Sequence, residues 1–167
     1  YMVTSAASDT GVIYIPATFN GKPVTEIAAN AFGTVSKPTG VDFSDAVNLE
    51  KIGDRAFYTR TSIVTLSGTE SLEKLVYVGE DAFYGTAWFN NSRDAAGNED
   101  IVLGNVLILY RGEQRDDDLN LSSVTAYDYI GYGAFGGCDF TSVTLPADIK
   151  GIENNAFENN AQLASVT

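Results

Sequence analysis

The sequence predicts a mainly β solenoid that has one short parallel strand in each coil and irregular or 3₁₀ segments opposite. The first observation behind this prediction is an internal repeat, marked by the dipeptide Ala-Phe at residues 31–32, 56–57, 82–83, 134–135 and 156–157. The second is a set of short runs in which apolar and polar residues alternate. Repeats with periods of roughly 20 to 50 residues are typical of solenoids, because no copy can bury its apolar face alone.

Apolar positions at fixed distances from each phenylalanine define the repeat. The phenylalanines follow one another at intervals of 25, 26, 52 and 22 residues. A β-branched residue stands five positions before each of them, and another large apolar side chain stands eight positions before. We expect equivalent residues to stack in columns along one core. The predicted columns are Ile27, Ile52, Val78, Ile130 and Ile152, and Phe32, Phe57, Phe83, Phe135 and Phe157.

Alternating triplets predict the strand of each coil. A period of two buries the outer residues of a triplet and exposes the middle one. Proline directly after Ile15 and Leu145 ends the strand, since its nitrogen has no hydrogen to donate. The predicted strands lie at residues 13–15, 41–43, 64–66, 119–121 and 143–145, and residues 165–167 resemble the start of a sixth.

One copy of the repeat is modified, because the period doubles after Phe83. A polar run at residues 94–100 has turn chemistry, and the apolar stretch at 101–110 contains the pair Gly104-Asn105. A glycine-containing pair between two apolar runs is typical of a tight hairpin. We therefore expect a hairpin insertion at about residues 86–118, inside a single domain that spans residues 1–167.

Composition and charge exclude several classes of function. The chain carries 22 acidic and 10 basic residues, a formal charge of -12 that repels nucleic-acid phosphates and anionic lipids alike. Its most apolar stretch is about half the length that a membrane span needs. The sequence has no histidine, which removes Ser-His-Asp and Cys-His catalysis and histidine metal sites. We expect no enzyme, no cofactor, no metal, no nucleic-acid partner and no membrane insertion.

The remaining chemical candidates are one cysteine, two acidic turns and a few aromatic residues. Cys138 stands at a repeat position, where we expect a small buried packing residue rather than a nucleophile. The acidic turns at residues 94–100 and 116–118 are typical of solvated loops, and the first departs from the EF-hand spacing for calcium. Four aromatic residues near predicted turns either anchor a partner or pack between coils. They are Tyr58, Tyr84, Trp88 and Phe89.

The middle residues of the strand triplets form the candidate binding site. Stacking of the coils places them in one row on a sheet face that solenoid curvature usually makes concave. A polar, mildly acidic row can receive an extended protein or glycan, and it is equally what a solvated sheet face requires. The row consists of Tyr14, Asp42, Thr65, Asn120 and Thr144.

The repeat also resembles a known family. The run from Phe135 to Cys138, the strand and proline at 141–146, and the residues from Ile152 to Phe157 follow that family's repeat almost position by position. Asn160 takes the place of the cysteine in the next copy. The family is that of the BspA-like leucine-rich repeats of bacterial surface proteins, also called Treponema-type, and the resemblance covers nearly the whole chain.

The resemblance implies a right-handed leucine-rich-repeat solenoid in a secreted or cell-surface bacterial protein, and several members of the family act as adhesins. We expect a non-enzymatic scaffold that binds a protein or a glycan. The alternatives are a structural spacer that carries a neighbouring domain and, more remotely, a hydrolase that uses carboxylates alone. A spacer predicts no group of exposed aromatic side chains, and an enzyme predicts a closed pocket with two converging acids. Because the chain stops inside a predicted strand, we expect it to be part of a longer protein.

Overall fold

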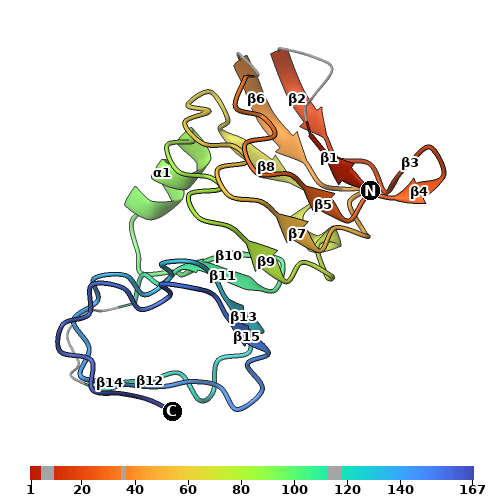
Figure 1. Ribbon diagram of the computed structural model, residues 1–167. Coiled ribbons are helices and arrows are strands. Elements are labelled where there is room, and N and C mark those ends of the chain that lie inside the picture. The colour runs from red at the N-terminus through yellow and green to blue at the C-terminus, as the bar shows by residue number, and fades with distance from the viewer. Residues whose placement is uncertain (5–9, 35–36, 113–117) are drawn as a thin grey trace.

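The computed structural model describes residues 1–4, 10–34, 37–112 and 118–167, which form a stack of coils built from short parallel strands (Figure 1). The predicted solenoid is confirmed. The stack has two halves, which meet at the hairpin near residue 105. Among the described residues, no helix has the length and hydropathy to cross a membrane.

Two parallel sheets build the first half. In one sheet the order is β1 (Met2–Val3), β5 (Glu26–Ile27), β7 (Lys51–Ile52) and β9 (Tyr77–Val78). In the other it is β2 (Thr10–Tyr14), β6 (Lys37–Asp42) and β8 (Thr65–Ser67). A small antiparallel hairpin of β3 (Thr18–Phe19) and β4 (Lys22–Pro23) and a 3₁₀ turn at Thr69–Ser71 lie outside these sheets.

The second half repeats this plan after the modified copy. One sheet has the order β10 (Ile101–Leu103), β11 (Val106–Leu109), β13 (Tyr129–Ile130) and β15 (Gly151–Ile152). The other has the order β12 (Asp118–Asn120), β14 (Ser142–Thr144) and β16 (Ser165–Val166). The predicted sixth strand at 165–167 is thereby confirmed.

A regular coil thus contributes two strands, where the sequence predicted one. The additional strands contain the β-branched column, and their ladder continues one residue further, since Gly53 N–H donates to Ile27 O at 2.8 Å and Gly79 N–H to Ile52 O at 2.9 Å. A strand of two residues is too short to show a period of two, which is why alternation did not reveal it. A Cβ at Gly53 would lie 2.4 Å from Ala29 N, so only glycine permits coils this close.

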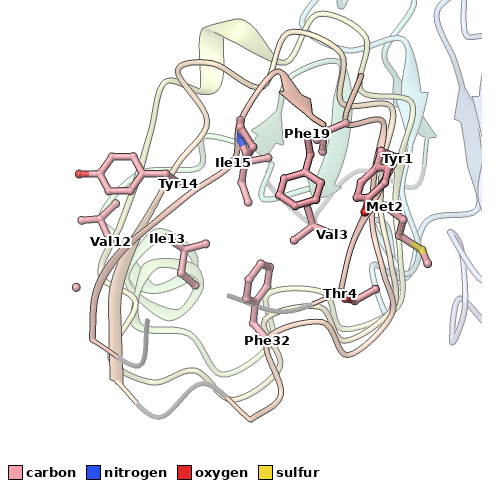
Figure 2. A pocket seen from close by; sticks show the side chains of 13 residues that line it. Tyr1, Met2, Val3, Thr4, Val12, Ile13, Tyr14, Ile15, Phe19 and Phe32 are labelled. Atoms are coloured by element: carbon pink, nitrogen blue, oxygen red, sulfur yellow. The ribbon is translucent and has the colours of Figure 1, made fainter. Parts of the chain in front are cut away.

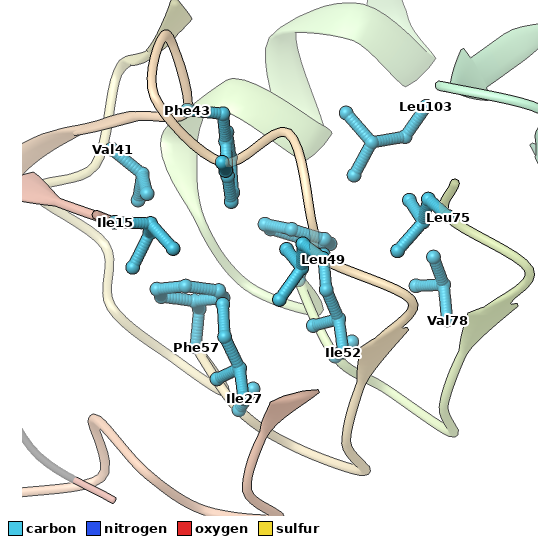
Figure 3. Packing of buried hydrophobic residues seen from close by; sticks show 14 of the residues in the cluster. Ile15, Ile27, Val41, Phe43, Leu49, Ile52, Phe57, Leu75, Val78 and Leu103 are labelled. Atoms are coloured by element: carbon cyan, nitrogen blue, oxygen red, sulfur yellow. The ribbon is translucent and has the colours of Figure 1, made fainter. Parts of the chain in front are cut away.

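The two predicted core columns lie inside the coils. Figure 3 shows Ile27, Ile52, Val78 and Phe57 in the core of the first half. The rings of Phe32 and Phe57 stack with centroids 4.7 Å apart, and those of Phe57 and Phe83 with centroids 5.1 Å apart. Two members of the last described coil depart from the prediction: Ile152 is 48% exposed and Phe157 is only half-buried, because no described coil packs on their outer side. The other eight are buried: Ile27, Phe32, Ile52, Phe57, Val78, Phe83, Ile130 and Phe135.

A left-handed residue turns the chain into each phenylalanine. The residue before the alanine has a positive φ in all five Ala-Phe copies. A second left-handed residue stands two positions after four of the five phenylalanines, and Thr59 is one of them. The first set is Asn30, Arg55, Asp81, Gly133 and Asn155, with φ between 54° and 62°.

The modified copy contains the predicted hairpin, since β10 and β11 pair antiparallel around Gly104-Asn105. Tyr110 takes the place of the missing phenylalanine: its N–H donates to Ala134 O at 2.8 Å, as Phe57 N–H does to Ala82 O. Its ring lies 5.1 Å from that of Phe135. The doubled period is therefore two ordinary ones, of 27 and 25 residues, with tyrosine at the join.

The helix α1 (Ala87–Asp94) was not predicted, and it replaces the strand that would follow β8. Thr86 caps it, because its hydroxyl accepts from Phe89 N–H at 3.1 Å and donates to Phe83 O at 2.8 Å. Trp88 packs its ring edge-on against Phe83, with centroids 5.2 Å apart. The middle of the helix is Asn90, Asn91 and Ser92, which are weak helix formers, so tertiary packing rather than propensity fixes it.

Thr59→Asn should stabilise the protein. A β-branched residue in the left-handed region is strained, and asparagine tolerates that region better. We expect the free energy of unfolding, measured by urea denaturation, to rise by roughly 0.5–1 kcal/mol. Thr61→Asn, at an exposed neighbour without a positive φ, is the control and should change nothing. An equal gain in both variants would contradict the strain argument.

Tyr127→Phe should also stabilise the protein. The hydroxyl of Tyr127 is buried and has no hydrogen-bond partner among the described residues. A buried polar group without a partner costs about 1–3 kcal/mol, so its removal should raise the free energy of unfolding by about 1 kcal/mol. Tyr77→Phe is the matched control, because that hydroxyl donates to Asp54 at 2.8 Å and its loss should bring no gain. A destabilised Tyr127→Phe variant would show that a water satisfies the hydroxyl.

Candidate functional site

The candidate binding residues of the first half lie on the outer face of the sheet β2-β6-β8. Tyr14 and Asp42 are register partners on neighbouring strands, as predicted. The next residue in that row is Ser67, because Thr65 pairs with Gly40 instead. Thr65 lies on the same face, but two residues before the position that pairs with Asp42, so its predicted place in the row was wrong. A shift of two residues keeps every side chain on its own face, and alternation cannot detect it.

The candidate residues of the second half lie on a different sheet. Asn120 and Thr144 are register partners on β12 and β14. The helix α1 and the residues that follow it stand between β8 and β12, so these two sheets do not join. The prediction of one continuous row of five residues was therefore wrong. The structure has two separate polar faces.

Tyr14 and Asp42 form the most prominent feature of the first face. The side chain of Tyr14 is 72% exposed. Asp42 accepts a hydrogen bond from Ser44 N–H at 2.8 Å. Hydrogen bonds from the Ser44 hydroxyl and N–H lower the pKa of Asp42 below its usual value, so the carboxylate is ionised and fixed in orientation. The pair offers a flat ring beside an oriented acceptor.

A cavity of about 580 Å³ opens beside this face, at the end of the stack formed by β1 and β2. Its lining is mostly apolar. Figure 2 shows Ile15, Phe19 and Phe32 pointing into it, whereas Tyr14 points away. The rings of Tyr1 and Phe19 lie 5.1 Å apart at its margin, and both are about half exposed.

The second face is a set of polar side chains that bind one another. The Asp118 carboxylate accepts from the hydroxyl of Ser142 at 2.5 Å and from that of Thr141 at 3.3 Å. The Thr167 hydroxyl lies 3.4 Å from that of Thr144. Asn120 accepts from Ser122 N–H at 3.0 Å. Neighbouring coils thus hold this hydroxyl-rich face in place.

The four aromatic residues near turns divide into two groups. Trp88 and Phe89 are half-buried and pack against the core, so packing explains them. Tyr58 and Tyr84 stack with ring centroids 5.6 Å apart, and Arg55 lies over the Tyr58 ring at 5.6 Å. Tyr84 is 51% exposed and remains available to a partner.

A cationic side chain fills the first acidic turn. The Arg111 guanidinium donates to the carbonyls of Ala95 at 2.7 Å, Gly97 at 2.9 Å and Glu99 at 3.3 Å. Asp100 accepts from Arg111 N–H at 2.8 Å. Within the described residues, no three acidic or cysteine side chains gather in a way that could hold a metal. Residues 116 and 117 of the second turn lie outside the described residues.

Cys138 is a packing residue, as predicted. It is buried in the core of the second half and unpaired. Burial raises the pKa of its thiol to about 11. With this pKa, almost none of the thiol is ionised at neutral pH. The thiolate is the nucleophilic form, so the folded protein offers almost no nucleophile at this position.

The sequence did not reveal a second cavity, of about 190 Å³, in the middle of the stack. It lies between the third Ala-Phe turn and the turn that leads into Phe135. The fourth copy has no Ala-Phe, and only two residues lie between Leu107 and Tyr110, where four lie between the equivalent positions elsewhere. The absent dipeptide was the signal that could have predicted a gap.

A model of one protein family matches the chain. Its description is BspA type leucine rich repeat region, and it matches six copies over residues 15–93 and 117–167. No curated protein and no solved structure matches. The family match covers both halves of the stack and leaves out most of the modified copy.

Alkylation should report the buried state of Cys138. With a pKa of about 11, only about one folded thiol in a thousand is ionised at pH 8, whereas an unfolded cysteine titrates near pH 8.5. We expect iodoacetamide to label the native protein at least about a hundredfold more slowly than the urea-unfolded protein, as followed by mass spectrometry. The native rate should rise with pH up to about 11. Rapid labelling at pH 7 would contradict the packing role.

Proposed function

The chain belongs to the BspA-type leucine-rich-repeat family, and from that premise we propose that it is a non-enzymatic scaffold that binds a protein or a glycan through its outer sheet faces. Leucine-rich-repeat domains generally mediate protein interactions. A stack of coils suits this role, because it presents equivalent positions at regular intervals on a rigid core. The candidate contacts are Tyr14, Asp42 and Thr65 on the first face and Asn120 and Thr144 on the second.

The exposure of Tyr14 carries this proposal. A tyrosine 72% exposed on a short strand contributes little to the core, whereas at an interface its ring offers apolar area and its hydroxyl a hydrogen bond. Asp42 stands beside it as an oriented, ionised acceptor. Tyr14 is also among the residues that line the apolar cavity at the end of the stack. Such a combination favours binding over solvation alone.

The alternatives fit the structure less well. A spacer needs no exposed aromatic residues, yet Tyr1, Tyr14, Phe19 and Tyr84 are each about half exposed or more. A hydrolase needs two free acids in a closed pocket. The large cavity has no acid in its lining. The smaller one has two, Asp81 and Glu158, which stand at its rim on opposite sides, and Asp81 lies 3.7 Å from Arg55. The family is typically non-enzymatic.

Family resemblance extends the proposal to place and role. BspA-type repeats are associated with bacterial surface proteins, so we place this chain in a secreted or surface-displayed bacterial protein. An adhesin is the role that joins display on a surface with a binding face. The net charge of -12 favours partners with basic surfaces over nucleic acid or anionic membranes.

The test is binding of the purified chain to immobilised extracellular-matrix proteins and glycans, measured by biolayer interferometry. We expect saturable binding to at least one member of the panel. Tyr14→Ala should weaken it at least about tenfold, as expected for an aromatic anchor worth about 1.4 kcal/mol or more. Asn120→Ala tests the second face separately, because the two faces do not join.

The control is Val47→Ala, at a 48% exposed residue that lies outside the strands of both sheets. Its binding should equal that of the parent chain. Circular dichroism should show the same unfolding midpoint for Tyr14→Ala and the parent. Absence of saturable binding across the panel would favour the spacer, and equal binding by all variants would remove the sheet faces from the site.

A further inference from the structure

The shortened turn of the modified copy leaves a notch in the stack. In a regular coil, two further residues lie between the β-branched position and the phenylalanine. Their absence opens the cavity of about 190 Å³ between the third coil and the coil of Phe135. We call this cavity the notch. Its lining includes Asp81, Tyr84, Phe89, Leu109, Tyr132 and Glu158.

Backbone groups at the notch lack the partners that regular coils have. Arg55 N–H donates to Glu80 O at 2.8 Å and Phe57 N–H to Ala82 O at 2.8 Å. The equivalent N–H groups of Asp81 and Phe83 have no acceptor among the described residues. A polypeptide that enters the notch can supply the missing carbonyl.

The size of the notch selects a single side chain. Its volume lies below the roughly 300–1,000 Å³ of pockets that hold small molecules. The half-buried side chains of Phe89, Ile108 and Leu109 form an apolar floor. A long side chain can lay its methylene groups on such a floor and keep a polar head at the rim.

Carboxylates stand at the rim on both sides. Asp81 comes from the third coil, and its contact with Arg55, at 3.7 Å on an exposed surface, is weak. Glu158 comes from the last coil and reaches across two glycines: its Oε1 lies 3.8 Å from the position of a Cβ on Gly133, and its Cγ lies 3.5 Å from one on Gly136. No described cation pairs with Glu158. The rim therefore favours a positive head group.

Tyr84 selects between the two basic side chains. Its ring stacks on Tyr58, which in turn lies under the guanidinium of Arg55. The residue that would follow Tyr84 in this column is Arg111, but its guanidinium turns away to the carbonyls of residues 95–99. A guanidinium is planar and stacks on aromatic rings better than an ammonium does.

From these observations we propose that the notch receives one arginine side chain of a protein partner. The side chain lies on the apolar floor, its guanidinium stacks on Tyr84 and pairs with Glu158 and Asp81, and its backbone carbonyl accepts from one of the two unpaired N–H groups. This assignment rests on the proposed binding function and narrows the partner to a protein. The notch is separate from the sheet-face residue Tyr14, so the two can be tested apart.

The probe is the blocked tripeptide acetyl-Gly-Arg-Gly-amide, titrated into the ¹⁵N-labelled chain and followed by NMR. We expect saturable shifts at the amides of Gly79, Gly131 and Gly133, with a dissociation constant on the order of 1 mM. The same tripeptide with citrulline, which has the shape without the charge, should bind at least about fivefold more weakly. The lysine tripeptide should fall between the two.

Variants distinguish binding in the notch from attraction to the net negative charge of the chain. Glu158→Gln removes one rim charge without changing volume and should weaken the arginine tripeptide about fivefold or more. Glu70→Gln, at an exposed acid on the 3₁₀ turn, removes the same charge elsewhere and should have no effect. Tyr84→Leu keeps the rim apolar, removes the ring face and should reduce the preference for arginine over lysine.

Several results would overturn the assignment. Equal binding of the arginine and citrulline tripeptides would show that the notch does not recognise the positive charge. Equal losses in Glu158→Gln and Glu70→Gln would show that binding depends only on the net charge of the chain. Stronger shifts of the same amides by a neutral oligosaccharide would assign the notch to a glycan. If Tyr14→Ala loses partner binding and no tripeptide binds the chain, the notch assignment is rejected and the sheet-face proposal stands. If the arginine tripeptide binds equally to Tyr14→Ala and the parent chain, the notch assignment is supported even if the sheet faces bind nothing.

Discussion

The column of aromatic rings inside the coils is the constraint on which the rest of the structure depends. Each coil contributes one ring to the column, and four ring residues also donate a backbone N–H to the next coil: Phe32, Phe57, Tyr110 and Phe135. The residue before each Ala-Phe pair has a positive φ, and this backbone conformation fixes the turn that leads to the ring. Where phenylalanine is absent, Tyr110 supplies the ring that packs on Phe135 and the hydrogen bond to the next coil. The rings thereby set the register of the coils.

A single deviation from this plan explains most of what is particular to the chain. The modified copy keeps the ring but shortens the turn before it, and it exchanges a strand for the capped helix α1. As a result the outer sheets do not continue from one half to the other, and a notch opens between coils. The repeated plan supplies a continuous packed core, and the deviation supplies surfaces that a regular solenoid lacks.

These surfaces differ in chemistry as well as in place. The first face has an exposed ring beside an oriented carboxylate, the second has hydroxyl groups held by Asp118, and the notch has an apolar floor with an acidic rim. A scaffold with separate sites can hold one extended partner at several points, where each weak contact raises the effective concentration for the next. The acidic side chains are spread over a thin stack of coils, which favours such surface recognition over a closed catalytic pocket.

The sequence by itself determined the solenoid, its core columns, the hairpin at Gly104-Asn105 and the packing role of Cys138, because periodic apolar positions report directly on what must be buried together. Tertiary structure alone decided the rest. Alternation is blind to a two-residue shift, so only pairing between coils revealed that Ser67, and not Thr65, follows Asp42. The helix α1 has weak propensity and forms because Trp88 packs on Phe83. The notch exists because neighbouring coils differ in length, a relation between copies that no single copy contains.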